Sequence, residues 1–139
     1  MHFLDSDTFS HLHAGHPHVV ANLRAVDDPD VGTTIVTKIE ILRARIAFVL
    51  KAATGEQLLR AQHWLQVSEE QLSNILIVSI DAAAAVEFDR LRRMRKLRRI
   101  GRADLLIASI SLANDATLVT RNLRHFQPIP NLRVVNWVD

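Results

Sequence analysis

Short apolar runs alternate along this chain with longer segments whose apolar residues recur at helical spacing. The short runs, which we predict to be strands, are residues 2–4, 31–37, 76–80, 117–120 and 132–137. Helical spacing occurs in residues 16–26, 38–52, 55–73, 84–97 and 103–113. Runs that are apolar on both faces and alternate with helices are typical of a parallel sheet covered on both sides. We therefore expect an α/β fold, a central parallel β-sheet flanked by α-helices.

The bulk composition limits the class of protein. The chain has 139 residues, of which 48% are hydrophobic, so we expect residues 1–139 to form a single domain with its own core. It has no cysteine, which excludes disulfides and thiolate metal sites. The N-terminal segment turns polar too early for a signal peptide, and no apolar run approaches the roughly 20 residues needed to cross a bilayer. We expect a cytoplasmic protein with no membrane contact.

The positive charge is concentrated in one segment. The net charge is only +2, but residues 90–99 read RLRRMRKLRR and hold seven of the 17 Lys and Arg residues. The rest of the chain is therefore mildly acidic. A basic block on an acidic body indicates a docking surface for a polyanion, and we expect a basic helix here that contacts an RNA backbone.

Four polar side chains are predicted to meet at one edge of the sheet. Asp5 follows the first predicted strand, and Asn122 lies just beyond the fourth. Glu40 falls in the first turn of the helix after the second strand, and Asp104 in the first turn of the last long helix. Because strand ends and the starts of the following helices share one edge of a parallel sheet, these four residues should converge.

Clustered carboxylates indicate a metal site. They repel one another unless a cation neutralises them, and oxygen ligands suit Mg²⁺ or Mn²⁺. Such an ion binds a phosphate oxygen, lowers the pKa of a bound water and stabilises the leaving oxygen. This is the chemistry of phosphodiester hydrolysis.

Most of these residues also have a structural interpretation. Glu40 stands three residues after Thr37, so the two can form a capping box. Asp104 at a helix start is favoured by the helix dipole, and Asn122 is a common turn residue. Asp5 has the weakest structural alternative, since aspartate is disfavoured beside a buried strand. The convergence of all four on one edge is what favours a functional site.

Three stretches of the sequence resemble the PIN-domain toxins of bacterial toxin–antitoxin systems, the VapC type. They are FLDSD, TKIEILRAR and GRADLLIASISLANDATLVTRNLRHFQPIPNLRVVNW. The resemblance implies a PIN-like fold and a Mg²⁺- or Mn²⁺-dependent endoribonuclease. The family's acidic metal ligands carry over onto Asp5, Glu40 and Asp104. Family members often have aspartate or asparagine at the place of Asn122, and Thr120 matches the hydroxyl residue just before it.

The chain departs from the family pattern near two of these positions. Asn122 supplies an oxygen without a charge, so a second metal would bind more weakly. Asp7 stands where the family commonly has asparagine, and it either adds charge to the site or caps the first helix. Arg102, just before Asp104, is the best single candidate for a phosphate-binding residue.

The resemblance also implies protein partners. Family members usually form homodimers and bind a small antitoxin beside the active site, often with a basic antitoxin side chain in the acidic pocket. Leu58, Leu59, Trp64 and Leu65 lie on one predicted helix and form either part of the core or an exposed contact patch. We expect Trp137 to belong to the core.

The histidines His11, His13, His16 and His18 have the composition of a metal-binding tract. Their spacing matches no zinc motif, so we expect a solvated or RNA-facing loop.

Two functional hypotheses follow. The first is a metal-dependent endoribonuclease toxin that leaves a 5′-phosphate and a 3′-hydroxyl. The second is a catalytically weak PIN-like module that binds RNA or a partner without cutting, which the neutral Asn122 supports. A receiver-type signalling domain is a distant third, because it needs a lysine after a late strand, where this chain has Arg121.

Overall fold

The computed structural model describes all 139 residues and contains a five-stranded parallel sheet. The strands are β1 (His2–Leu4), β2 (Val31–Thr34), β3 (Leu76–Val78), β4 (Thr117–Val119) and β5 (Arg133–Val135). Their order across the sheet is β3-β2-β1-β4-β5, and every neighbouring pair is parallel. The predicted α/β fold is therefore confirmed, with β1 at the centre of the sheet.

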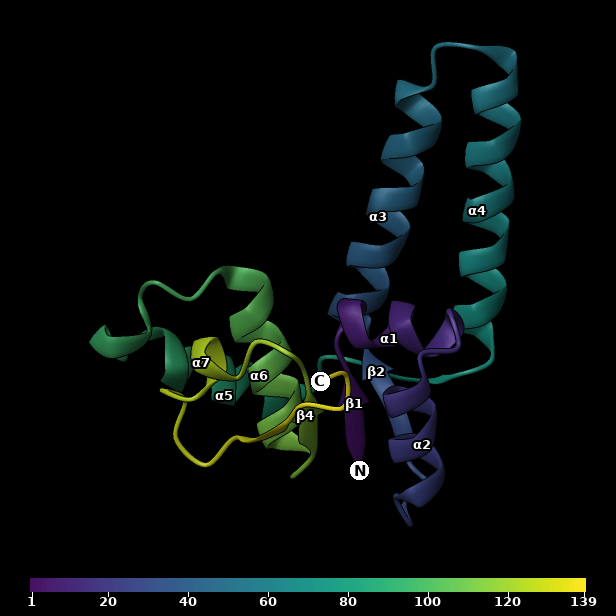
Figure 1. Cartoon of the computed structure of the whole chain (residues 1–139). Coiled ribbons are helices and arrows are strands. Elements are labelled where there is room, and N and C mark those ends of the chain that lie inside the picture. Colours follow the sequence, from purple (N-terminus) through teal and green to yellow (C-terminus); the bar gives the residue numbers. More distant parts are fainter.

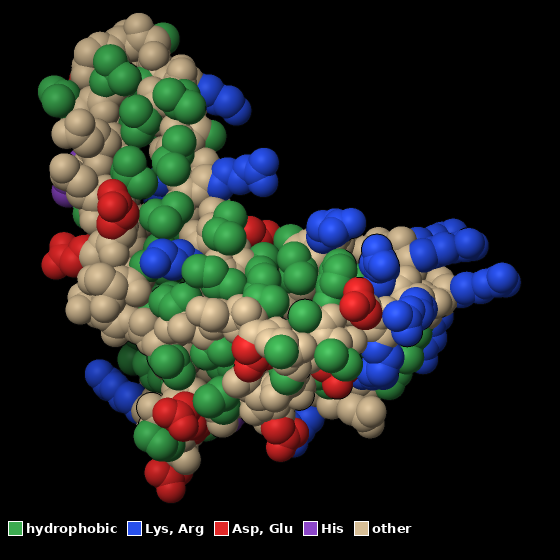
Figure 2. Space-filling view, turned by 180° about the vertical axis from the view of Figure 1, so that it is seen from behind, with side chains coloured by type: hydrophobic (Ala, Val, Ile, Leu, Met, Phe, Trp, Pro, Cys, Tyr) green, Lys and Arg blue, Asp and Glu red, His purple; other side chains and the backbone are tan.

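Seven α-helices connect and cover the strands. They are α1 (Ser6–His13), α2 (Pro17–Ala25), α3 (Ile35–Lys51), α4 (Gly55–Ser73), α5 (Ala82–Arg92), α6 (Arg102–Ala113) and α7 (Leu123–Phe126). Helices α3 and α4 form an antiparallel hairpin, the arm, which projects from the body of the protein (Figure 1). Hydrophobic side chains run along the arm, and Lys and Arg side chains gather at the far end of the body (Figure 2). No helix has the length and apolar character needed to cross a bilayer.

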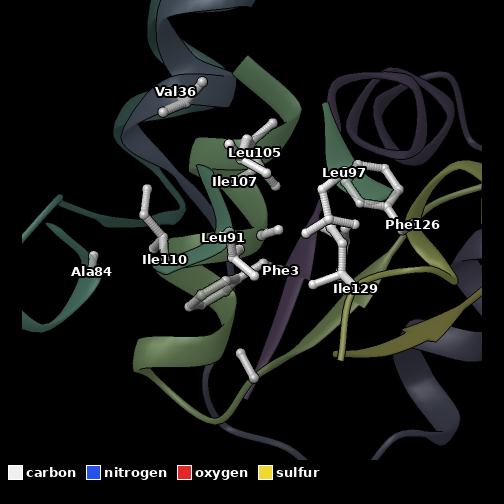
Figure 3. Packing of buried hydrophobic residues seen from close by; sticks show 13 residues of the cluster. Phe3, Val36, Ala84, Leu91, Leu97, Leu105, Ile107, Ile110, Phe126 and Ile129 are labelled. Carbon is white, nitrogen blue, oxygen red and sulfur yellow. The ribbon is translucent and has the colours of Figure 1, made fainter. Parts of the chain in front are cut away.

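The two faces of the sheet are covered by two separate hydrophobic clusters. Successive strand residues point to opposite faces, so Phe3 packs with α5 and α6 while Leu4 packs with α1 and α2. Figure 3 shows the first cluster, in which Leu91 and Ile110 surround the buried ring of Phe3. Trp137 is 5% exposed and belongs to the second cluster, as predicted. Burial on both faces explains why the strands read as continuous apolar runs.

The sheet is tight at Gly32 in β2. A Cβ atom at this position would lie 2.8 Å from the Cβ of Leu76 on β3, and it would also collide with the Leu76 carbonyl oxygen. A backbone oxygen held in a sheet cannot move away cheaply, so only glycine fits here.

The basic segment is not the single helix that we predicted. Helix α5 ends at Arg92, and a short 3₁₀ turn, η1 (Arg95–Leu97), follows before α6 begins. Arginine and lysine residues one turn apart repel each other, which disfavours a continuous helix through this segment. Leu97 is nevertheless 2% exposed, so the turn is anchored in the core while its charges stay in solvent.

Candidate functional site

Asp5 follows β1 and takes part in two backbone connections. Its amide donates a hydrogen bond to the Val119 carbonyl at the end of β4, at 3.0 Å. Its carboxylate Oδ1 accepts from the Thr8 amide at 2.8 Å, so Asp5 is the N-cap of α1. Our expectation that Asp5 has little structural role is wrong, because the chain turns directly from strand into helix at this residue. Its second carboxylate oxygen has no hydrogen-bond partner in the protein.

Glu40 lies in the second turn of α3, not in the first. The helix begins three residues earlier than predicted, because Thr34 is its N-cap and accepts from the Thr37 amide at 3.2 Å. The predicted capping box between Thr37 and Glu40 is therefore wrong. Glu40 is half-buried and has no hydrogen bond or ion pair, so its carboxylate has no structural partner.

The electrostatics of Glu40 reveal the cluster. Partial burial raises its pKa, and the negative charges of Asp104 and Asp5 raise it further. The three carboxylates come from the end of β1, from α3 and from the start of α6, and the charges of both aspartates act on Glu40. Asp5 and Asp104 therefore lie within electrostatic range of Glu40.

Asp104 lies in the first turn of α6, as predicted, after an N-cap residue, Gly101, that provides no side-chain cap. Its Oδ2 is 2.8 Å from Nε2 of His125 on α7, a close contact whose angle lies outside hydrogen-bond geometry. Sequence reasoning missed His125. The only available signal was its place three residues after Asn122, which puts it on the short helix that begins at the same edge.

Thr120 and Asn122 lie just beyond β4. Thr120 is fully buried, and its Oγ1 accepts from the Asn122 amide at 3.0 Å. Its own amide donates to the Val135 carbonyl of β5 at 2.9 Å. Asn122 is the N-cap residue of α7, but its side chain makes no cap hydrogen bond. Thr120 thus holds the backbone of Asn122 in place, while the exposed side-chain amide of Asn122 stays available to a ligand.

Two other predicted residues face elsewhere. The Arg102 guanidinium lies over the Phe88 ring, 5.7 Å from its centre, on the side of α5. Asp7 is exposed and pairs with Arg121 at 3.8 Å and with His11 at 3.5 Å. It does not cap α1, since Asp5 does, so the capping interpretation of Asp7 is wrong.

The histidine tract is helical and not a loop. His11 and His13 belong to α1, His16 precedes α2 and His18 lies within it. The ring centres of His11 and His16 are 5.0 Å apart, and the His18 Nδ1 lies 3.0 Å from the Val138 carbonyl oxygen. The tract therefore packs at the junction of the first two helices, where Pro17 starts the second one.

The carboxylate site suits a hard divalent cation. No group of three or more His, Asp or Glu side chains is preassembled to hold an ion. Mg²⁺ keeps several waters and is commonly held by one or two carboxylates together with substrate phosphates, so it needs no complete protein cage. Asp5 and Glu40 both have carboxylate oxygens without a hydrogen-bond partner, and the negative charge of Asp104 acts on Glu40. These donors fit Mg²⁺ or Mn²⁺ and lack the soft ligands of other metals.

The arm carries the exposed hydrophobic residues of the patch considered above. Leu59 is 72% exposed and Trp64 46%, so this patch is not part of the core. A pocket of about 460 Å³ lies between the two helices of the arm, lined by Phe48, Trp64 and several basic side chains. Arg45 lies over the Trp64 ring at 5.5 Å. The arm thus leaves several large apolar side chains exposed to solvent.

Comparison with known proteins agrees with this architecture. A model of the PIN domain family matches residues 2–130. Over 68 residues the chain is 41% identical to ribonuclease VapC2 of Rickettsia felis, a match that covers 48% of this chain and 51% of the relative. A tRNA(fMet)-specific endonuclease VapC of Salmonella typhimurium is 31% identical over 85 residues, covering 60% of this chain and 64% of the relative. The sequence matches thus span between about half and two thirds of these two relatives.

Solved structures match over nearly the full length. VapBC2 from Rickettsia felis, bound to a DNA fragment from its promoter, has a TM-score of 0.74 and 26% identity, covering 98% of each chain. VapBC-1 from nontypeable Haemophilus influenzae has a TM-score of 0.78 and 18% identity, covering 99% of this chain and 98% of the other. At 18% identity, the match to the Haemophilus influenzae structure shows a shared fold only.

Proposed function

Because this chain belongs to the PIN domain family, we propose that it is a metal-dependent endoribonuclease, the toxin of a type II toxin–antitoxin system, and that residues 1–139 form its single domain. The observation that carries the proposal is the match of the PIN domain family to residues 2–130, which includes Asp5, Glu40 and Asp104, together with the placement of Glu40 within range of both aspartate charges. Three half-buried carboxylates that repel one another lower the stability of the fold. A bound cation would neutralise them, so a metal-binding function explains why they lie near one another.

Asp5, Glu40 and Asp104 would hold Mg²⁺ or Mn²⁺. Bound there, the ion would polarise a phosphate oxygen and make a water molecule more acidic. His125 Nε2, 2.8 Å from Asp104 Oδ2, limits the positions that the Asp104 carboxylate can take. The cap hydrogen bond from Thr8 does the same for Asp5.

The reaction is the attack of water on phosphorus with departure of the 3′ oxygen, which leaves a 5′-phosphate and a 3′-hydroxyl. Glu40, which has no hydrogen bond or ion pair in the protein, would be free to accept a proton from the attacking water, and the departing 3′ oxygen would take up a proton from solvent. Asn122 is free to hydrogen-bond a phosphate oxygen, and Thr120 holds its backbone in place. Arg102 contacts the RNA farther from the carboxylates.

The proposed partners are a small antitoxin and a second copy of the chain. The similar structures from Rickettsia felis and Haemophilus influenzae are VapBC complexes. The exposed apolar side chains of the arm, Leu59 and Trp64 among them, offer a surface of the kind that such contacts bury. A basic side chain of the antitoxin would be attracted to the carboxylates. The expected compartment is the cytoplasm.

The test is incubation of the purified protein with structured RNAs in Mg²⁺ or Mn²⁺, and again in EDTA. We expect cutting that needs the metal and disappears in Glu40→Gln and Asp104→Asn, both of which keep side-chain size. These variants, purified identically, also control for contaminating nuclease. RNA that stays intact in every condition, while the protein still binds it, would refute the proposal. That outcome would favour the non-catalytic binding module, which the neutral Asn122 supports.

A further inference from the structure

The basic end of the body contains a small pocket that the proposed reaction does not use. It has a volume of about 240 Å³ and lies between α5, the η1 segment and the start of α6. Its lining consists of Phe88, Arg92, Leu97, Arg98, Ile100, Arg102 and Leu105. Pockets for drug-sized ligands are roughly 300–1,000 Å³, so this one suits a smaller group.

Phe88 organises two of the arginines. The guanidinium of Arg102 lies 5.7 Å from the centre of its ring and that of Arg92 lies 6.0 Å from it. Phe88 itself is half-buried and packs against the large hydrophobic cluster, so the ring is a fixed platform. Arginines held in this way lose less side-chain entropy when they bind an anion.

The charge of the pocket is largely uncompensated. Arg92 has only a long contact, 4.0 Å, to Asp89, and Arg98 and Arg102 form no ion pair. The lining contains no carboxylate. By contrast Arg90, which lies outside the pocket, is held by Glu87 at 2.6 Å. The pocket therefore combines three available guanidinium groups with an apolar floor.

This combination matches one kind of ligand. Guanidinium groups bind phosphate oxygens in a bidentate manner, and their flat faces stack on nucleobases. An apolar floor accepts the flat face of a base that has left its stack. Arg102 and Asp104 both lie in the first turn of α6 but on different sides of it, so the pocket is separate from the carboxylates and meets another part of the RNA chain.

We propose that this pocket binds one unstacked nucleotide of single-stranded RNA, with its phosphate on Arg98 and its base on the flat guanidinium faces of Arg92 and Arg102, which the Phe88 ring supports from below. The inference rests on the proposed ribonuclease function and assigns a site that holds the substrate away from the carboxylates. A duplex cannot offer a free base, so the pocket selects unpaired RNA.

The test measures binding in EDTA, where no cleavage occurs, by the fluorescence anisotropy of a short labelled oligouridylate. We expect Arg98→Ala and Phe88→Leu each to weaken binding by at least about fivefold, the effect of losing one stacked base or one bidentate contact. Arg99→Ala is the matched control, since it removes the same charge from the neighbouring residue outside the pocket, and we expect less than about a twofold change. Thermal melting of each variant verifies the fold.

Two results would overturn the proposal. The first is equal weakening by Arg98→Ala and Arg99→Ala, which would mean that only overall charge matters. The second is competition by oligoglutamate as strong as by unlabelled oligouridylate, which would make the surface a docking site for an acidic protein. The nuclease proposal is judged separately, by cutting in Mg²⁺. If the protein cuts RNA but Arg98→Ala and Arg99→Ala weaken RNA binding equally, the pocket proposal alone is refuted. If binding depends on Arg98 but no RNA is cut, the nuclease proposal alone is refuted.

Discussion

Replacing Asp5 with asparagine and with alanine separates its structural role from its proposed catalytic role. The carboxylate accepts the Thr8 amide hydrogen bond at 2.8 Å and so caps α1. Asparagine retains an oxygen at the same place, and it is as good an N-cap as aspartate. Alanine removes the acceptor altogether. Both changes remove the negative charge that a metal would need.

The expected magnitudes differ between stability and activity. Loss of the cap in Asp5→Ala lowers the free energy of unfolding by about 1 kcal/mol, within a range of roughly 0.5–2 kcal/mol. For a chain of this size that is a fall in Tm of roughly 3–5 °C. Asp5→Asn keeps the cap and also relieves the repulsion on Glu40, so its stability should stay within about 0.5 kcal/mol of the wild type. Cleavage should fall by at least about 100-fold in both variants.

Thermal unfolding followed by circular dichroism, together with RNA cleavage in Mg²⁺, measures both quantities on the same samples. If Asp5→Asn is as unstable as Asp5→Ala, the cap is not what Asp5 contributes to stability. If Asp5→Asn cuts RNA at the wild-type rate, Asp5 is not a metal ligand, and the reasoning from clustered charges fails.

Three further predictions concern charge and packing. The folded state keeps the Glu40 proton to a higher pH than the unfolded chain, so without metal the free energy of unfolding should fall as pH rises above the ordinary glutamate range. Glu40→Gln should flatten that slope and Mg²⁺ should raise the wild-type Tm, whereas identical melts with and without Mg²⁺ would argue against the site. The hydrogen bond with His2 lowers the pKa of Asp28, so its contribution to stability is complete above the usual aspartate range and declines as pH falls toward the lowered pKa of the folded state. Asp28→Asn should cost about 1–2 kcal/mol at pH 7 in urea unfolding and progressively less as pH falls below the usual aspartate range. Gly32→Ala should destabilise by about 3 kcal/mol or more in the same assay, because the added methyl meets the Leu76 backbone, and a near-neutral result would show that β2 and β3 can separate.

The fold was accessible from the sequence because its signals are local. Apolar runs with flanking helical periodicity predicted all five strands and the long helices, and α4 begins and ends where the pattern placed it, at residues 55 and 73. Helix α3 was placed too late, since Ile35, Val36 and Thr37 have β-branched side chains that favour a strand. The cap by Thr34 and the packing of Val36 in the core overrule that preference.

The histidine tract and the basic segment show the same limit. Both were judged from composition, which says what a segment contains but not how it is folded. His11 and His13 are helical because Asp5, which lies outside the tract, caps α1. In the basic segment the repulsion between neighbouring charges can be read from the sequence, but the burial of Leu97 after the end of α5 depends on the core against which it packs.

The sequence by itself determined which residues reach the functional edge, because in a parallel sheet the position of Asp5, Glu40 and Asp104 after or beside a strand fixes the end at which they lie. Tertiary structure alone decided how their side chains are used. In the folded protein one carboxylate oxygen of Asp5 caps α1, His125 contacts Asp104, and the Arg102 guanidinium lies over the Phe88 ring. Such contacts join segments far apart in the chain, and they depend on rotamers and packing that no local pattern encodes.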